Sequence, residues 1–399
     1  MRKINVFITI LTVCLSLSAD RLFSQINDRP YVIFISADGF RYDYATKFNA
    51  KNLLHLSSGG VRAKSMIPSY PSVTRPNHYS LVTGLYPGHT GIAGNTFYDP
   101  ESKMMFNKME ARWFTSQSIW QTASKSGVIT ANINYPDART ITKGMKDVYQ
   151  IQKPKDLTID DQLDAIQKWL KMPEAKRPHL ITLYFNDTDH KGHIYGPDAV
   201  EVVDAAKKID DNIGRIDALV KSIGLPVDII FVSDHGMISI DKKDIIPIPA
   251  AIDTTKFVVS NQNSLVNIFA KDASDIMGTY KNLLTKEKNE YKAYLNSNLP
   301  LNWHYGGNDD KYKRAGDIIL VAQYPKTFNN KAGRGMHGFD PEKVVEMGAS
   351  FMAWGPSFKK GITIEPFKNV EVYHLLSTIL GLQITINDGK GTLSKEILN

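Results

Sequence analysis

The stretch Leu183–His193, which reads LYFNDTDHKGH, indicates the fold class of this chain more clearly than any other segment. Its first residues complete an apolar run at 179–185 that is short, rich in β-formers and bounded by polar residues, a pattern that predicts a buried strand. The seven residues 187–193 then supply two carboxylates, two imidazoles and a glycine. Because ligands in open α/β sheets bind just beyond the carboxyl ends of strands, this order predicts an α/β sheet with a site at that edge.

Asp189 and His193 lie on either side of Gly192 in the polar part of this stretch. We expect a loop here, and a loop that turns back at the glycine would bring both side chains to one cation. A carboxylate oxygen together with an imidazole nitrogen suits zinc or a similar divalent metal. Taken alone, the stretch is equally compatible with a solvated polar loop that binds nothing.

Two further apolar runs end in residues of the same kind. Residues 31–36 lead to Asp38, and residues 227–232 lead to Asp234 and His235. Both runs read as buried strands, so their polar ends are predicted to lie at the catalytic edge of the same sheet. Asp38 is also suited to capping the next helix, and Asp-His pairs on loops are commonly structural.

Thr74 stands before Arg75 and Pro76, where a helix is expected to begin because proline is favoured in the first turn. Backbone N–H groups at such a helix start attract anions. A free threonine hydroxyl is a poor nucleophile, but beside a divalent cation its alkoxide becomes accessible. The glycine-rich turn at 91–100 presents Asn95, whose amide can donate to a phosphoryl oxygen. Taken alone, Thr74 is an ordinary helix cap and Asn95 a structural loop residue.

Together these motifs resemble the nucleotide pyrophosphatase/phosphodiesterase family of the alkaline phosphatase superfamily. In chain order they are Asp38-Gly39-Phe40-Arg41, Thr74 with Pro76-Asn77-His78-Tyr79, Gly94-Asn95 with Tyr98-Asp99-Pro100, Tyr184, Asp189, Gly192-His193, Gly196-Pro197, Ser233-Asp234-His235-Gly236-Met237 and Gly335-Met336-His337-Gly338-Phe339-Asp340. The resemblance runs from about residue 31 to residue 337 and beyond, and several separate motifs in the right order make it specific.

The resemblance implies an alkaline-phosphatase-like α/β fold, with a largely parallel central sheet, helices on both faces and an inserted subdomain. We place the insertion at about 242–332, where the sequence is mixed and polar and contains several prolines and glycines, and we expect it to form one wall of the site. The remaining expected elements are helices at 116–126, 157–170, 199–223 and 370–380 and strands at 128–133 and 349–353.

The resemblance also implies a pair of zinc ions. One would be held by Asp189, His193 and His337, and the other by Asp38, Asp234, His235 and Thr74. Two cations about 3.5–4 Å apart can stabilise both the attacking and the leaving oxygens of an in-line displacement. Thr74 would form a phosphothreonine intermediate, and Asn95 with the N–H of Thr74 would hold a non-bridging oxygen. The other seven histidines are expected to be structural: His55, His78, His89, His179, His190, His304 and His374.

Four residues are candidates for substrate contacts, and each has a structural alternative. Tyr184 occupies a position that faces the nucleoside in family members, but it can equally fill the core. Arg75 replaces the family's phenylalanine after the nucleophile and can add a phosphate contact. Tyr135, which we also place among the substrate-binding residues, begins a loop that replaces the family's Trp-Pro-Gly-Ser type. Arg139 can reach a terminal phosphate, as cations do in the monoesterase branch, or remain a solvated surface arginine.

Residues 1–24 have the charged start and short apolar run of a secretory signal peptide, followed by the phosphodiesterase domain at 25–399. Cleavage after Ser24 and cleavage after Ala19 both fit the pattern. The only cysteine, Cys14, lies in this leader, so cysteine usage says nothing about the redox state of the compartment. We expect export to a periplasm or to the cell exterior.

The net charge of +7 and the sequence pI of about 9.1 favour anionic ligands. There is no basic run interleaved with aromatic residues and no second apolar segment that could cross a membrane, so we expect neither a nucleic-acid partner nor a membrane span in the mature chain. The prediction is an exported two-zinc phosphodiesterase or nucleotide pyrophosphatase acting on a small molecule. A phosphomonoesterase, a glycerophosphodiester or lysophospholipid phosphodiesterase and a non-catalytic binding protein remain alternatives, and the oligomeric state is open.

Overall fold

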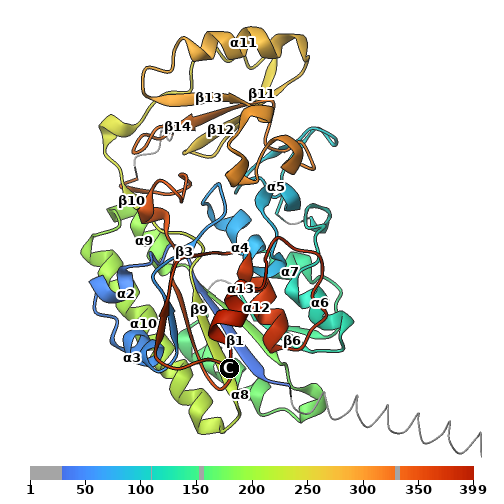
Figure 1. Ribbon diagram of the computed structural model, residues 1–399, viewed down its shortest axis with the longest axis vertical. Helices are drawn as coiled ribbons and strands as arrows, with labels where there is room; N and C mark the ends of the chain where they lie inside the picture. Colours follow the sequence, from blue (N-terminus) through green and yellow to red (C-terminus); the bar gives the residue numbers. More distant parts are fainter. Residues whose placement is uncertain (1–28, 109, 152–156, 329–332) are drawn as a thin grey trace, which may run out of the picture.

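The computed structural model describes residues 29–108, 110–151, 157–328 and 333–399. The predicted leader at 1–24 lies outside these residues. Figure 1 shows two parts, a large sheet flanked by helices and, above it, a smaller sheet covered by one helix. Among the described residues, no helix is both long and apolar enough to cross a membrane.

The central sheet has eight strands in the order β17–β2–β16–β9–β1–β8–β6–β7. Their bounds are Ile362–Ile364, Val61–Ala63, Phe351–Trp354, Val227–Val232, Tyr31–Ala37, Leu180–Phe185, Thr130–Ile133 and Val148–Gln150 in that order. All neighbours run parallel except β16, which is antiparallel to both β9 and β2. The predicted α/β fold with a largely parallel central sheet is therefore confirmed.

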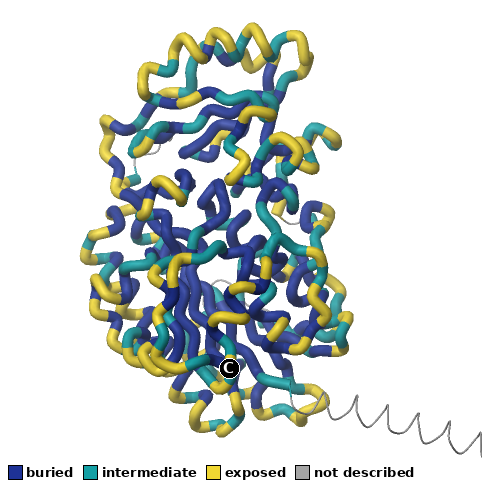
Figure 2. Tube along the Cα trace, viewed as in Figure 1, coloured by how far each residue is buried: buried dark blue, intermediate teal, exposed yellow. Residues whose placement is uncertain are grey.

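Both faces of this sheet are covered by helices. Along β1, Ile33 and Ile35 pack into one core, whereas Val32 and Phe34 pack into the other. Burial on both faces explains why the strands read as continuous apolar runs rather than as alternating ones. The first core includes residues of α3 (Lys51–Ser58), α8 (Ile159–Leu170) and α10 (Val200–Ile223), and the second residues of α4 (Thr74–Thr83), α6 (Ile119–Lys125) and α12 (Glu371–Ile379). Figure 2 shows the sheet as the most deeply buried layer.

The polar stretch after β8 is a helix, α9 (Asp187–Tyr195), where we expected a loop. Its only buried residues are Thr188 and Gly192, so it has no apolar stripe by which the sequence could reveal a helix. Acidic residues in its first turn suit the positive end of the helix dipole, and it ends at Gly196, which has a φ of +95°. Asp189 and His193 therefore converge through helical i, i+4 spacing and not through a turn at the glycine.

The other expected elements exist with shifted ends, for local reasons. The helix expected at 116–126 begins at Ile119 because Ser118 and Gln121 form a capping box. The helix expected at 157–170 begins at Ile159 because Thr158 caps it together with Asp161. Cap residues have non-helical backbone angles, so apolar periodicity alone extends a helix too far toward its start.

The smaller sheet is antiparallel, with the order β11–β12–β14–β13, and it has its own apolar core. Its strands are Phe257–Asn261, Leu265–Ala270, Ile318–Ala322 and Tyr291–Leu295 in that order, and the helix above it is α11 (Ser274–Leu284). The chain leaves the central part after β10 (Ile238–Ser239) and returns at β15 (Gly335–Met336), and these two strands pair with each other. The predicted insertion at 242–332 lies between them, although its limits as a domain remain a prediction.

Short elements complete the chain. They are α2 (Tyr44–Lys47), α5 (Pro87–Thr90), α7 (Ala138–Ile141), α13 (Thr392–Ile397), β3 (Met66–Ile67), β18 (Phe367–Lys368) and the hairpin strands β4 (Tyr98–Asp99) and β5 (Met104–Met105). The β4–β5 hairpin follows the Asn95 turn directly, so it connects that turn to the surface of the inserted sheet.

Candidate metal centre

The carboxyl ends of three neighbouring strands bring the predicted acidic ligands together. Asp38 follows β1, Asp234 follows β9, and Asp189 lies on α9 directly after β8. Because β1 is paired in parallel with both β8 and β9, the three ends share one edge of the sheet. Backbone bonds fix their relation: the N–H of Gly39 donates to Oδ1 of Asp234 at 3.1 Å, and the N–H of Asp189 donates to the carbonyl of Asp38 at 3.0 Å.

Asp189, His193 and His337 form the first half of the cluster. Oδ1 of Asp189 lies 3.3 Å from Nε2 of His193 and 3.6 Å from Nε2 of His337, and the two Nε2 atoms are 3.1 Å apart. The Nδ1 atoms donate to backbone carbonyls, that of His193 to Gly335 at 3.0 Å and that of His337 to Ser72 at 2.9 Å. Since a carbonyl only accepts, each neutral ring presents the lone pair of Nε2 to the cluster, as a metal ligand must.

Asp38, Asp234, His235 and Thr74 form the second half. Nε2 of His235 lies 3.4 Å from Oδ1 of Asp38, 3.1 Å from Oδ2 of Asp234 and 3.2 Å from Oγ1 of Thr74. The rings of His235 and His337 stack at 3.6 Å, which joins the two halves into one cluster. The structure thus brings all seven predicted ligands into one connected cluster.

Three carboxylate oxygens in this cluster are buried without a hydrogen-bond partner among the described residues: Oδ1 of Asp38, Oδ1 of Asp189 and Oδ2 of Asp234. A buried, unpartnered carboxylate is costly in free energy, and three of them in one place require a positive charge. Carboxylate oxygen and neutral imidazole nitrogen are the donors that zinc and related divalent ions prefer. The cluster therefore fits a divalent metal.

The pKa values of Asp38 and His337 agree with this interpretation. Burial and the neighbouring charges of Asp234 and Asp189 raise the pKa of Asp38 well above its usual range. Burial, together with two adjacent imidazoles, lowers the pKa of His337 to about 3. A cation relieves the first effect, and the second keeps the ring in the neutral form that binds metal. Against the effect of burial, Asp189 raises the pKa of His193 and Asp234 raises that of His235, so the carboxylates favour a positive charge at this place.

His78 lies against this cluster, although the sequence suggested only a structural role. Its Nδ1 donates to the carbonyl of Thr74 at 2.9 Å and lies 3.4 Å from Oδ2 of Asp234, and its Nε2 lies 2.9 Å from Oγ of Ser36. Burial lowers the pKa of His78, so the neutral ring accepts from the serine hydroxyl. His78 is a positioning residue for Thr74, and its place one helical turn after Thr74 was the signal that the sequence offered.

Tyr184 is held by the cluster. Its hydroxyl donates to Oδ2 of Asp38 at 2.5 Å, and its partly exposed ring borders a cavity of about 390 Å³. Gln162 of α8 also lines this cavity, and its Oε1 is buried without a partner in the described part of the chain. Tyr184 can therefore offer a ring edge or face to a bound group, whereas its hydroxyl is already engaged.

Arg75 and Asn95 are joined by two hydrogen bonds. The N–H of Arg75 donates to Oδ1 of Asn95 at 2.8 Å, and Nη1 of Arg75 donates to the carbonyl of Asn95 at 2.9 Å. Nε of Arg75 donates to Oδ2 of Asp137 at 2.6 Å, and the guanidinium lies over the ring of Phe106. The guanidinium is thus engaged by Asp137 and Asn95, so its contact with a phosphate stays a prediction, and no hydrogen bond from Nδ2 of Asn95 to another described residue is present.

The structure also differs from our expectation for Tyr135, which lies in the core. It is only 3% exposed, and its hydroxyl donates to the carbonyl of His78 at 3.1 Å, so it has no surface for a substrate. Asn134 and Asp137 both have left-handed backbone angles, which reverse the loop on either side of the tyrosine and turn it inward. Arg139 is exposed on α7.

These observations define the class of the chain, an α/β protein with a carboxylate–histidine cluster beneath a helix-terminal threonine. Two solved structures of ectonucleotide pyrophosphatase/phosphodiesterase 5 share its fold. The human protein has a TM-score of 0.85 at 25% identity and covers 92% of this chain and 100% of its own, and an inactive murine variant in complex with AMP has a TM-score of 0.84 at 25% identity, with coverages of 93% and 100%. The predicted alkaline-phosphatase-like architecture is confirmed by these neighbours.

Residues 32–340 match the family described as type I phosphodiesterase / nucleotide pyrophosphatase. Human ectonucleotide pyrophosphatase/phosphodiesterase family member 1 is 30% identical over 93% of this chain and 42% of its own length. A pyrophosphatase/phosphodiesterase of Schizosaccharomyces pombe is 32% identical over 90% of this chain and 78% of its own, and a venom phosphodiesterase of Crotalus durissus collilineatus is 31% identical over 97% and 48%. The chain belongs to this family of hydrolases, and it spans less than half the length of the human and venom relatives.

Proposed function

We propose that this chain is an exported two-zinc phosphodiesterase or nucleotide pyrophosphatase that cleaves phosphodiester or phosphoanhydride bonds of nucleotides through a phosphothreonine intermediate. The observation that carries the proposal is the position of Thr74. Its hydroxyl lies 3.2 Å from Nε2 of His235, at the edge of the unpartnered carboxylates and at the start of α4. A nucleophile needs both an activating cation and donors for the phosphoryl oxygens, and this position offers both.

For the two zinc ions we keep the division of ligands that the family resemblance implies. Asp189, His193 and His337 would hold one zinc, and Asp38, Asp234, His235 and Thr74 the other. Bound zinc supplies Lewis acidity, which lowers the pKa of a coordinated hydroxyl or water and neutralises charge that develops on oxygen.

Thr74 attacks phosphorus, a bond forms between its Oγ1 and phosphorus, and the bond to the leaving oxygen breaks. Water then attacks the phosphothreonine and restores the hydroxyl. The N–H of Thr74 and Nδ2 of Asn95 would donate to a non-bridging oxygen; the bond from the N–H of Arg75 to Oδ1 of Asn95 supports this, since it leaves Nδ2 as the donor. His78 holds the carbonyl of Thr74 and so maintains the direction of its hydroxyl.

The nucleoside part of the substrate would lie in the cavity beside Tyr184. The partly exposed tyrosine ring can stack on a base. The AMP complex of the murine structural neighbour supports a nucleotide as the substrate class. The engaged guanidinium of Arg75 gives no support to a phosphomonoesterase.

Export to a periplasm or to the cell exterior remains part of the proposal and rests on the leader pattern at 1–24. The partner is a small phosphodiester or nucleotide, and the oligomeric state remains open. N-terminal sequencing of the protein recovered from the culture medium or periplasm, compared with the cytosol, tests the compartment.

The chemistry is tested with purified, zinc-loaded protein and three substrates: bis-(4-nitrophenyl) phosphate, 4-nitrophenyl phosphate and glycerophosphocholine. We expect the diester to be turned over far faster than the monoester, with two zinc ions per chain and a phosphorylated Thr74 trapped by acid quench. Thr74→Ala should lose the intermediate and at least 10³-fold in rate, an order of magnitude typical of a missing nucleophile, whereas Thr74→Ser should retain both. Preference for the monoester, or a diester rate unchanged in Thr74→Ala, overturns the proposal, and rapid choline release would identify a lipid-headgroup enzyme instead.

A further inference from the structure

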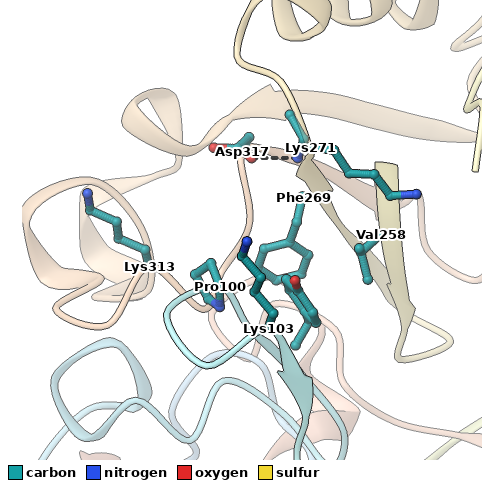
Figure 3. A pocket seen from close by; sticks show the side chains of 9 residues that line it. Pro100, Lys103, Val258, Phe269, Lys271, Lys313 and Asp317 are labelled. Atoms are coloured by element: carbon teal, nitrogen blue, oxygen red, sulfur yellow. Dashed lines mark hydrogen bonds between the residues drawn. The ribbon is translucent and has the colours of Figure 1, made fainter. Parts of the chain in front are cut away.

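A second cavity, of about 530 Å³, shares no residue with the metal centre. Figure 3 shows it at the junction of the β4–β5 hairpin and the inserted sheet. The hairpin segment contributes Tyr98, Pro100 and Lys103, the inserted sheet contributes Val258 and Phe269, and the loop before β14 contributes Lys313. The cavity is large enough for a ligand the size of a mononucleotide.

The floor of this cavity is apolar. Phe269 is 4% exposed, and its ring packs edge-on against Tyr98 at 5.1 Å. Pro100 and Val258 lie on opposite sides of Phe269 in the view of Figure 3. Tyr98, Pro100 and Val258 are half-buried around this ring, so they offer an apolar surface to a planar group.

The rim is cationic, and two of its charges are not used within the described chain. Lys271 donates to the carbonyls of Thr254 and Thr255 at 3.2 and 2.9 Å, and its side chain extends away from Phe269. Lys103 and Lys313 are exposed, and the described residues offer neither of them an ion pair or a side-chain hydrogen bond. Their ammonium groups are therefore available to an anion. In Figure 3 the side chain of Lys313 extends away from Phe269, so this exposed side chain must turn toward the cavity to bind there.

Lys103 and Lys313 share an unusual backbone. Their φ angles are +54° and +55°, in the left-handed region that favours glycine. Such a conformation is unfavourable for an L-residue, so both lysines stand on tight turns of their loops. Asp317, the one carboxylate at the rim, has its Oδ2 engaged by the N–H of Ala270 at 2.8 Å.

We propose that this cavity is a second, non-catalytic binding site for a compact anion with a planar aromatic body, such as a nucleoside monophosphate. The ring packs against the half-buried side chains of Tyr98, Pro100 and Val258, and the phosphate is held by Lys103 and Lys313. Apolar floor and cationic rim together select this class, because a free inorganic anion leaves the floor unused and an uncharged ring leaves the lysines unused.

Calorimetric titration of zinc-loaded protein with AMP tests the site, with Lys103→Gln/Lys313→Gln as the variant and Lys311→Gln as the control. Lys311 is an exposed lysine of the same loop that does not line the cavity. We expect the double variant to lose one AMP per chain and the control to lose none. Each lysine should contribute about tenfold in affinity, as one charge-assisted hydrogen bond does, and the loss should grow smaller at high salt because the rim is exposed.

A Val258→Trp variant, which fills the cavity without touching a charge, should lose the same AMP. Adenosine and inorganic phosphate should each bind this site at least tenfold more weakly than AMP. Equal AMP stoichiometry in wild type and double variant overturns the proposal, and so does equal affinity for phosphate and AMP. A negative result would leave the proposed phosphodiesterase activity untouched, because the difference between wild type and double variant measures only the AMP whose binding depends on the two lysines.

Discussion

The hydroxyl of Tyr184 donates a hydrogen bond to Oδ2 of Asp38 over 2.5 Å. Burial and the adjacent charge of Asp38 raise the pKa of Tyr184 well above its usual range, so the hydroxyl keeps its proton and acts as the donor in this bond. The bond occupies one oxygen of Asp38 and turns the other, Oδ1, toward His235. Tyr184 therefore orients Asp38, a proposed metal ligand, in addition to bordering the cavity that we propose for the nucleoside.

Tyr184→Phe should weaken zinc binding by about 10–100-fold, the range typical for loss of a partner that orients a metal ligand. The ring and its stacking surface remain, so KM for a nucleotide should change much less than zinc affinity. Competition with a fluorescent chelator measures the zinc affinity directly. Tyr149→Phe is the matched control, because the hydroxyl of Tyr149 donates to a backbone carbonyl on the exposed surface. Unchanged zinc affinity with a raised KM would assign Tyr184 to the substrate alone.

Arg75→Met should lower kcat by about tenfold with little change in KM. The change removes the ion pair with Asp137 and the bond to the carbonyl of Asn95, so Asn95 is held only through its side chain. A donor that is misplaced for the transition state costs rate more than ground-state binding. Arg112→Met, at an exposed arginine paired with Glu110, is the control. A raised KM at constant kcat would restore the phosphate contact that the sequence suggested for Arg75.

The sequence was most informative where strands end. Asp38 and Asp234 directly follow uninterrupted apolar runs, and parallel strands leave no freedom about which edge their ends share. His337 could be assigned as a ligand only through its motif, because the whole inserted sheet lies between it and the other ligands along the sequence. The pairing of β10 with β15 brings the chain back to the cluster after the insertion. Each of these strands has only two residues, too few to show an alternating apolar pattern in the sequence.

The errors have a common physical origin. The helix α9 buries only Thr188 and Gly192, so its pattern could not be distinguished from a loop. Tyr135 turns inward because Asn134 and Asp137 adopt left-handed angles, and asparagine and aspartate permit such angles without requiring them. In both segments the backbone conformation, and not the residue types, decides which way a side chain points.

Removal of metal should destabilise the protein. Without a cation, Asp38, Asp189 and Asp234 leave three unpartnered carboxylate oxygens together, and binding at about 1,000 times Kd stabilises the folded state by about 4 kcal/mol. We expect EDTA to lower Tm by several degrees and stoichiometric zinc to restore it, measured by calorimetry. Asp38→Asn should raise the Tm of the metal-free protein, because one repelling charge is gone, and lower the Tm of the zinc-loaded protein. A variant that is less stable in both forms would show that repulsion between these carboxylates is not the cause.

A pH-dependent contribution to stability is expected at His89, which joins α5 to two distant segments. Its Nδ1 lies 2.7 Å from Oδ2 of Asp388 and its Nε2 lies 3.0 Å from Oδ1 of Asp309, which also contacts His304. The hydrogen bond to Asp388, aided by Asp309 and opposed by burial, raises the pKa of His89. The folded protein therefore holds this proton more tightly than the unfolded chain, so the stabilisation is complete below about pH 6.5 and is lost as pH rises through the folded pKa.

His89→Gln, which keeps a polar side chain of similar size without the charge, should thus cost more stability at pH 5.5 than at pH 8.5. The site is partly open to solvent, so we expect a difference of at most about 1 kcal/mol, and it should shrink in high salt. Urea unfolding of both proteins at the two pH values measures it. His55→Gln, at an exposed position of α3, should show no such difference. An equal cost of His89→Gln at both pH values would mean that the neutral imidazole stabilises the fold as much as the charged one.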